Sequence, residues 1–202
     1  MQRPLALFGA TLAALLAGQP AMAACTDAAA PGAEWRRCLL DEENLTGVDL
    51  SKADLRDSSF KRSDLSRSNL SQVQARRAKF VSAMMQGVDL SGADLVQADF
   101  TSADLSGAKL TGASLRAARL FQANLRGADL TGAVLIGTDL LRTDFSGARW
   151  TDGTTICAEG SLDRCQPVPP GTAPKVDGNA ITAPGGAPVP AASATLPAPA
   201  GG

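Results

Sequence analysis

Leu or Phe recurs at every fifth residue through the middle of the chain. From Leu45 to Trp150 this register holds for 22 successive units without an insertion or deletion. The central position of the unit holds 15 Leu, 4 Phe, Met85, Trp150 and one small residue, Ala75. A period of five is neither the 3.6 of an α-helix nor the 2.0 of a β-strand. It therefore predicts one short extended piece and one turn per unit.

The residues around the centre are also regular. Ala stands two residues before the centre in 13 of the 22 units, and Asp or Asn stands immediately before it in 13. We expect the large residue to fill an interior and the small one to fit a tight corner. Gly two residues after the centre, as at Gly107, suits a turn that needs unusual backbone angles.

This A-(D/N)-L-x-x unit, undisturbed in Ala93-Asp94-Leu95 and Ala128-Asp129-Leu130, resembles the pentapeptide-repeat protein family over residues 44–152. The resemblance implies an all-β fold, a right-handed quadrilateral β-helix with four units per coil.

Three columns of residues support a coil of twenty. Such a coil stacks Phe60, Phe80 and Phe100 above one another. It also stacks residues whose charges alternate in sign at about one strand spacing, ~4.8 Å, where opposite charges help. One such column is Asp89, Lys109, Asp129, Arg149, and another is Lys79, Asp99, Arg119, Asp139.

The N-terminus is typical of a secretory signal peptide, residues 1–23. Arg3 precedes an uncharged apolar run that is too short for a membrane span of about 20 residues. Small residues at Ala21 and Ala23 fit cleavage after Ala23. A lipoprotein signal ending at a lipidated Cys25 is the alternative. We expect a periplasmic or secreted bacterial protein with no transmembrane span after cleavage.

The four cysteines form two local pairs outside the repeats, Cys25 with Cys38 and Cys157 with Cys165. An even number in an exported chain predicts disulfides, and free buried thiols are the alternative. We interpret residues 24–43 as an N-terminal cap and residues 153–165 as a C-terminal disulfide cap, with Ile156 turned inward.

Residues 166–202 are rich in Pro, Ala and Gly, and only Lys175 and Asp177 are charged. Such a segment buries too little apolar surface to offset its ordering entropy. We predict a disordered tail that can be removed without unfolding the rest.

The sequence predicts no catalytic, cofactor-binding or metal site. There is no His and no Tyr in the chain, which removes the commonest general base and the commonest zinc ligand. No column before the centre has Asp on two successive coils, so the aspartates do not converge on a metal ion. We expect a non-enzymatic protein without cofactors.

The most specific functional hypothesis is a protein–protein interaction or assembly module. Four apolar residues gather at outward positions late in the repeat: Phe121, Val134, Ile136 and Leu141. An exposed patch of this kind predicts a homodimer or partner interface. The alternative explanation is that a few apolar residues are always exposed, or that the cap or the tail covers these four residues.

A second hypothesis comes from the family resemblance, because some pentapeptide-repeat proteins inhibit DNA gyrase by mimicking duplex DNA. A DNA-mimicking topoisomerase inhibitor needs an acidic rod. Residues 44–152 carry 12 acidic and 14 basic side chains, which opposes this hypothesis, as does the export signal. Basic residues without interleaved aromatic ones also give no reason to expect nucleic-acid binding.

Overall fold

The computed structural model describes Cys25 and residues 28–168, whose secondary structure consists of turns and single-residue β-bridges. Residues 31–150 repeat one five-residue conformation 24 times, two turn residues followed by a short extended piece. Every parallel bridge joins residues twenty apart, from Glu34↔Asp54 to Asp129↔Arg149. Four units therefore make one coil. The chain is a right-handed quadrilateral β-helix, as the resemblance implied.

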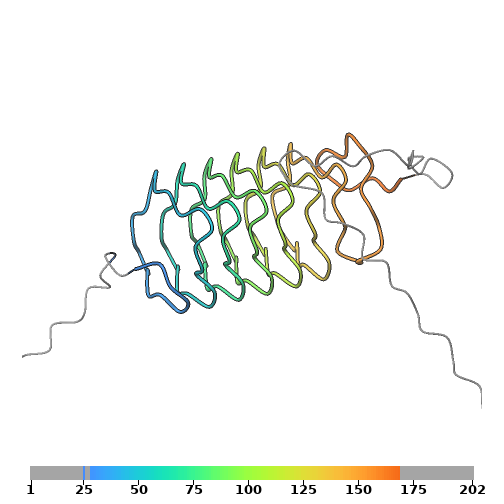
Figure 1. Ribbon diagram of the computed structural model, residues 1–202. Helices are drawn as coiled ribbons and strands as arrows, with labels where there is room; N and C mark the ends of the chain where they lie inside the picture. The colour runs from blue at the N-terminus through green and yellow to red at the C-terminus, as the bar shows by residue number, and fades with distance from the viewer. Residues whose placement is uncertain (1–24, 26–27, 169–202) are drawn as a thin grey trace, which may run out of the picture. The chain divides into compact units, whose positions relative to one another are not determined.

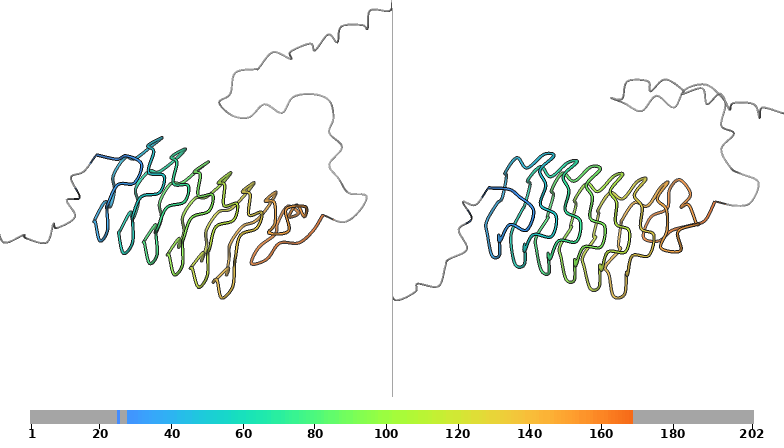
Figure 2. Two further views of the ribbon diagram at one scale, coloured as in Figure 1. Left: turned by 90° about the horizontal axis from the view of Figure 1, so that it is seen from below. Right: turned by 60° about the horizontal axis from the view of Figure 1, so that its bottom comes forward.

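Figure 1 shows the coils stacked side by side along one axis, from the first coil in blue to the C-terminal cap in orange. The two further views in Figure 2 show the same succession. The chain divides after Val168 into two units, and all described residues lie in the first. The predicted signal peptide and residues 169–202 of the predicted tail lie outside the described residues. In the described part we find no helix with the length and hydropathy of a membrane span.

The β-helix begins earlier than the repeat pattern indicated. We interpreted residues 24–43 as a separate cap, but residues 31–43 have the same turn and bridge conformation as the coils that follow. Trp35 and Leu40 continue the five-residue register, and Trp35 is buried at a central position. Their neighbours, Cys38 and Glu34 among them, depart from the usual Ala and Asp, which hid these units in the sequence.

The interior is filled by one large side chain from each unit. All central residues from Leu50 to Leu130 have no exposed surface. Phe60, Phe80 and Phe100 stack in one column, as predicted, with ring centroids 5.2 and 4.9 Å apart and nearly parallel planes. Each buried Leu or Phe contributes about 1.5–3 kcal/mol by the hydrophobic effect, so the column of coils has an ample core.

Polar residues at the small inward position are satisfied by the coil below. Ser68 and Thr143, which take the place of the usual Ala, donate their hydroxyl protons to the carbonyls of Leu45 and Leu120 at 2.6 and 2.7 Å. A buried hydroxyl without such a partner would cost about 1–3 kcal/mol. The wall therefore accepts Ser and Thr as well as Ala.

The second turn residue of each unit has a positive φ, as type II turns require. Gly107 occupies this position with a φ of 66°, whereas Ala117 occupies it two units later with a φ of 52°. L-residues reach this region at a cost of roughly 1–2 kcal/mol. The non-glycine turns therefore hold strain that the coil-to-coil contacts offset.

We expect Gly107→Ala to destabilise the protein by about 1 kcal/mol, and Ala117→Gly to stabilise it by a similar amount. A Cβ added at Gly107 meets nothing within 4 Å, so the effect is conformational rather than steric. Urea denaturation measures both changes. Ser106→Ala, one residue earlier in the same turn, is the control. Equal stabilities of the Gly107→Ala and Ser106→Ala variants would contradict the prediction.

Ala75 is the one small central residue, and the backbone around it is undistorted. The Leu55 N–H donates to the Gln74 carbonyl at 2.8 Å, and the Ala75 N–H donates to the Asp94 carbonyl at 2.9 Å. We expect Ala75→Leu to raise the melting temperature, because Leu stands in the same column on both neighbouring coils. Thermal unfolding followed by circular dichroism measures this. A clear loss of stability would mean that neighbouring side chains already fill the space.

Candidate functional site

The aspartates before the centre are turn-forming residues. Asp or Asn immediately precedes the central residue in 13 units. The side chain of this Asp or Asn accepts a hydrogen bond from the backbone N–H two residues later. Asp129, for example, accepts from the N–H and the hydroxyl of Thr131 at 3.0 and 2.6 Å. Asn69 makes the same backbone contact with Ser71 at 3.1 Å. The shared geometry explains why Asp and Asn alternate freely at this position.

These hydrogen bonds stabilise the ionised carboxylates. The Thr131 hydroxyl, together with the Thr131 N–H, lowers the pKa of Asp129 below its usual value. The Thr155 hydroxyl and the N–H groups of Thr155 and Thr154 lower the pKa of Asp152 to about 2. Among residues 25 and 28–168, no three His, Cys, Asp or Glu side chains are grouped to hold a metal ion.

The charged columns are paired between coils. The Lys109 ammonium lies 3.8 Å from the Asp89 carboxylate, and the Arg119 guanidinium lies 3.1 Å from that of Asp99. Both pairs join residues twenty apart, as the alternation of signs predicted. Because these side chains are exposed, each pair contributes little to stability, about 0–1 kcal/mol. Their main effect is to leave no long surface of a single charge along these columns.

Each end of the β-helix carries one disulfide, and the described residues include no free cysteine. At the N-terminal end Cys25 is joined to Cys38, with Cα atoms 5.5 Å apart. Cys38 stands at the small inward position of its unit and is fully buried. The disulfide thus fastens the segment before the first coil to the interior wall of that coil.

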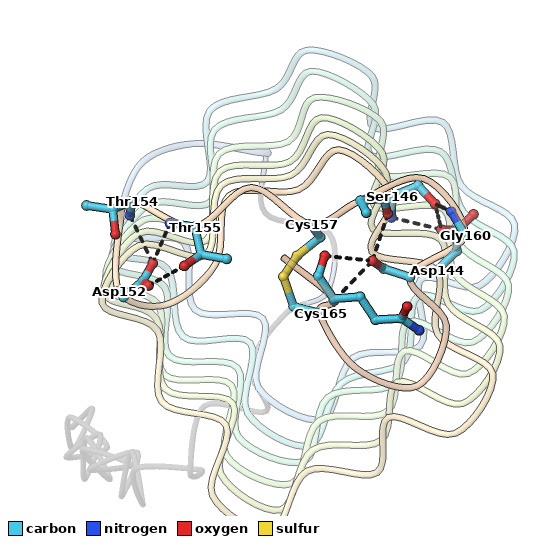
Figure 3. Close-up of a disulfide and its surroundings, with 11 residues drawn as sticks. Asp144, Ser146, Asp152, Thr154, Thr155, Cys157, Gly160 and Cys165 are labelled. Carbon is cyan, nitrogen blue, oxygen red and sulfur yellow. Dashed lines mark hydrogen bonds between the residues drawn. A yellow bond between two sulfur atoms is a disulfide. The ribbon is translucent and has the colours of Figure 1, made fainter. Parts of the chain in front are cut away.

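At the C-terminal end Cys157 is joined to Cys165, with Cα atoms 4.9 Å apart. Figure 3 places this disulfide between two corners of the coil. At one corner Asp152 accepts hydrogen bonds from Thr154 and Thr155, and at the other the Gly160 N–H donates to the Ser146 hydroxyl at 3.0 Å. The Trp150 N–H also donates to the Thr155 carbonyl at 2.8 Å, so the cap is tied to the last coil on both flanks.

The cap differs from its prediction in two respects. Ile156 is 39 % exposed rather than turned inward, and the interior beneath the cap is filled instead by Trp150, edge-on to Phe145. The cap also extends beyond residue 165. Residues 166–168, which we assigned to a disordered tail, pair with it through the Cys157↔Pro167 antiparallel bridge.

The four residues of the predicted interface lie on the last coils, with unequal exposure. Leu141 is 54 % and Ile136 67 % exposed, whereas Phe121 and Val134 are partly buried. The Gln122 N–H donates to the Leu141 carbonyl at 3.0 Å, so Phe121 lies directly below Leu141 as expected. The exposed apolar surface formed by these four residues is therefore smaller than the sequence indicated.

Sequence reasoning missed part of this apolar region. In the cap, Leu162 is 53 % and Ile156 39 % exposed. The central residues Leu135 and Leu140 are only partly buried. One signal was available: Thr155 and Gly160, twenty residues after these two leucines, cannot supply another large central residue. The exposed apolar surface thus belongs to the unfinished end of the coil rather than to one flat face.

The lowered aspartate pKa values predict how stability depends on pH. An Asp side chain in the unfolded chain has a pKa of about 3.9. Carboxylates with a lower pKa in the folded protein therefore contribute stability that is fully present above about pH 5. That stability is lost as pH falls through the folded values, which reach about 2 at Asp152. We expect the free energy of unfolding to be nearly constant from pH 7 to 5 and to fall steadily from pH 4 to 2.

Asp129→Asn should retain the turn, as Asn69 does, while removing one titrating group. The expected result is a shallower loss of stability below pH 4 than in the unmodified protein, measured by urea denaturation at five pH values. If both proteins lose stability with the same slope, the hydrogen-bonded carboxylate does not contribute to the acid transition.

Two family models match the chain. The model described as a pentapeptide repeat region matches residues 53–130, and the model described as pentapeptide repeats in eight copies matches residues 23–57 and 113–149. No curated protein matches.

Several solved structures are similar to the chain over its repeats. HetL, a pentapeptide repeat protein involved in heterocyst differentiation regulation from the cyanobacterium Nostoc sp. strain PCC 7120, is 23 % identical, with 60 % of this chain and 93 % of HetL covered and a TM-score of 0.31. The alr5209 protein of Nostoc PCC 7120 is 43 % identical over 40 % of this chain and 67 % of its own, with a TM-score of 0.40.

A trypsin-treated form of QnrB1, a plasmid-mediated fluoroquinolone resistance protein, is 22 % identical over 58 % of this chain and 72 % of its own, with a TM-score of 0.37. The family models together span nearly all of the coils that the structure describes, and their five-residue period is the period of those coils. The chain belongs to the pentapeptide-repeat family.

Proposed function

We propose that this protein is an exported, non-enzymatic scaffold that binds a protein partner, or a second copy of itself, through the apolar surface near its C-terminal end. The observation that carries the proposal is where large exposed apolar side chains lie. Among the described residues there are six, and four of them lie on the last coil and the cap: Ile136, Leu141, Ile156 and Leu162. Large apolar side chains gathered at one end of an otherwise polar molecule support a contact site there.

The disulfides support export. All four cysteines are paired, one pair at each end of the β-helix. Disulfides persist in oxidising compartments such as the bacterial periplasm and are rare in the cytosol. Together with the signal-like sequence of residues 1–23, this supports a periplasmic or secreted location. Cleavage after Ala23 leaves Cys25 free to pair with Cys38, whereas lipidation of Cys25 would prevent that disulfide.

A role without catalysis fits the chemistry of the surface. Catalytic carboxylates need to face one cleft, but the aspartates lie on successive sides of the coil and accept hydrogen bonds from turn N–H groups, as at Asp64 and Asp129. The chain also contains no His to act as a base. The interior is filled by Leu and Phe side chains, so the coil itself offers a surface rather than a pocket.

The alternative function, a DNA-mimicking topoisomerase inhibitor, is less well supported. QnrB1 is a fluoroquinolone resistance protein, and a related role would require an acidic rod. The surface here is balanced instead, because Arg77 pairs with Asp57 at 2.6 Å and Lys109 with Asp89 at 3.8 Å across neighbouring coils. Such pairing cancels the field that an anionic DNA mimic needs.

Within the apolar surface, Phe121 and Leu141 lie one above the other. They occupy the same turn position on successive coils. Apolar side chains of this size dominate the energetics of protein interfaces when a partner buries them. The neighbouring charges, Asp139 and Arg142, stand where the polar rim of an interface is expected.

The double variant Phe121→Asp with Leu141→Asp should abolish self-association or partner capture and leave the circular dichroism spectrum unchanged. Sedimentation velocity and pull-down from a periplasmic extract, each with the mature protein, measure the two outcomes. The matched control is Ser91→Asp with Thr111→Asp, which places the same two charges at the same turn position on another side of the coil. The proposal is wrong if both double variants keep the sedimentation behaviour and the partners of the unmodified protein.

A further inference from the structure

The C-terminal end of the β-helix is stepped rather than flat. The sides of the last coil are centred on four residues: Leu135, Leu140, Phe145 and Trp150. The cap forms β-bridges over the Phe145 and Trp150 sides, whereas no segment among the described residues forms a bridge above the other two sides. Leu135 and Leu140 are only partly buried. The open step of this end therefore consists of the Leu135 and Leu140 sides.

The cap on the Trp150 side shows how a strand adds to the end of a coil. The Trp150 N–H donates to the Thr155 carbonyl at 2.8 Å. In return the Cys157 N–H donates to the Ala148 carbonyl, also at 2.8 Å. The bridge between these two hydrogen bonds is antiparallel. The coil thus uses its central N–H, and the carbonyl two residues earlier, to bind one antiparallel strand.

The Phe145 side repeats this arrangement. The Phe145 N–H donates to the Ser161 carbonyl at 2.8 Å. The Asp163 N–H donates to the Thr143 carbonyl at 3.0 Å, and the bridge is again antiparallel. On each side a residue of the added strand that bonds the coil is also buried, as Cys157 and Ser161 are. The last coil therefore accepts an antiparallel strand on two adjacent sides.

The Leu135 side presents the same pair of backbone groups. Its central N–H and the Ala133 carbonyl, two residues earlier, have no hydrogen-bond partner within the described part of the chain. The outward residues beside them, Val134 and Ile136, are apolar, and Gly137 follows. Since unpaired edges invite pairing with a further strand, this side is suited to an uncharged, apolar one.

The Leu140 side is less suited to such a strand. Asp139, immediately before its centre, is exposed and charged. The Arg142 N–H already donates to the carboxylate of Asp163 in the cap. Charges at a sheet edge discourage strand pairing, so the site narrows to the Leu135 side.

At the N-terminal end of the β-helix the corresponding sides are polar. The partly buried Leu40 is followed by three exposed acidic residues, Asp41, Glu42 and Glu43. The partly buried Leu45 lies between Asn44 and Thr46. An apolar strand that paired with these sides would remove polar and charged groups from water, which costs free energy. The C-terminal end is therefore the one that favours an apolar strand.

The step also disfavours a second β-helix stacked end to end as the partner. Over the Trp150 side the cap adds one strand at Ile156 and a second at Pro167. Two strand spacings are roughly 10 Å, so the end of a second β-helix would contact the cap before its backbone reached Leu135. A single extended strand is narrow enough to lie beside the cap.

We propose that the Leu135 side binds an extended, uncharged and apolar segment of a partner protein, which adds to the coil as one antiparallel strand. The segment donates an N–H to the Ala133 carbonyl and accepts the Leu135 N–H, as Cys157 and Thr155 do over the Trp150 side. The residue that faces Leu135 is apolar, because its side chain covers the exposed part of Leu135. This inference rests on the proposed function and defines the partner by its backbone conformation.

A synthetic peptide serves as the probe of this site. It is acetyl-Thr-Val-Thr-Val-Thr-amide with N-methyl groups on its Thr residues, so that only the edge with the Val N–H groups can pair. In the cap a residue that bonds the coil also faces its interior, as Cys157 does. The Val residues therefore supply both the hydrogen bonds and the side chains that cover Leu135. The matched control is the same peptide with the N-methyl groups on its Val residues, which blocks that edge and keeps the side chains.

Amide hydrogen exchange of the mature full chain, followed residue by residue by NMR, measures the outcome. We expect an excess of the probe to slow exchange of the Leu135 N–H by about tenfold or more, because that N–H gains a hydrogen bond. The control peptide should leave this exchange unchanged. The Leu115 N–H, which donates to the Val134 carbonyl at 2.9 Å, reports whether the β-helix itself has changed.

Several results would overturn the proposal. No slowing at Leu135 with the probe, or equal slowing with both peptides, excludes strand pairing on this side. Slow exchange before any peptide is added excludes a partner strand as well. It assigns the edge to another part of the chain if it persists on dilution, and to a second copy if it does not. The Phe121→Asp with Leu141→Asp variant leaves the Leu135 edge in place, so this inference and the proposed function can fail separately.

Discussion

The backbone ladder between coils is the interaction on which the rest of the structure depends. Up to the unit centred on Leu130, each unit exchanges hydrogen bonds of 2.7 to about 3.0 Å with the unit twenty residues later, and single-residue bridges replace extended strands. Every coil lies one strand spacing, about 4.8 Å, from the coil before it. Each residue therefore packs against the residue at the same position of the neighbouring coil. The Phe60 to Phe100 stack, the turn aspartates and the alternating charges all follow from that single spacing.

This constraint decides what the sequence could predict. Each inward position admits few residue types. The sequence therefore predicts the period of five, the coil of twenty and the phenylalanine column. The first two units were missed because Trp35 and Leu40 lie beside Cys38 and Glu34, which the repeat pattern does not contain. Ile156 was placed wrongly for a related reason: outside the repeat the chain pairs in antiparallel fashion, and the register no longer says which side chains face inward.

The candidate site was predicted in outline only. Exposure of Ile136 and Leu141 follows from their outward turn positions, but the partial burial of Phe121 depends on the coil above it. Leu135 and Leu140 are incompletely buried because, within the described residues, no coil follows on these two sides. That feature belongs to the end of a stack, where the repeating pattern stops and no longer describes the surroundings of a residue.

The positions of the two tryptophans have a practical consequence. Trp35 lies in the first coil and Trp150 in the last, and the chain contains no tyrosine. In a stack whose layers contact only their neighbours, the ends can open independently of each other and of the middle. Each end therefore has its own intrinsic fluorophore. When one tryptophan is replaced by phenylalanine, the fluorescence of the remaining tryptophan reports local unfolding at one end of the β-helix. Two such variants therefore follow the unfolding of the two ends separately.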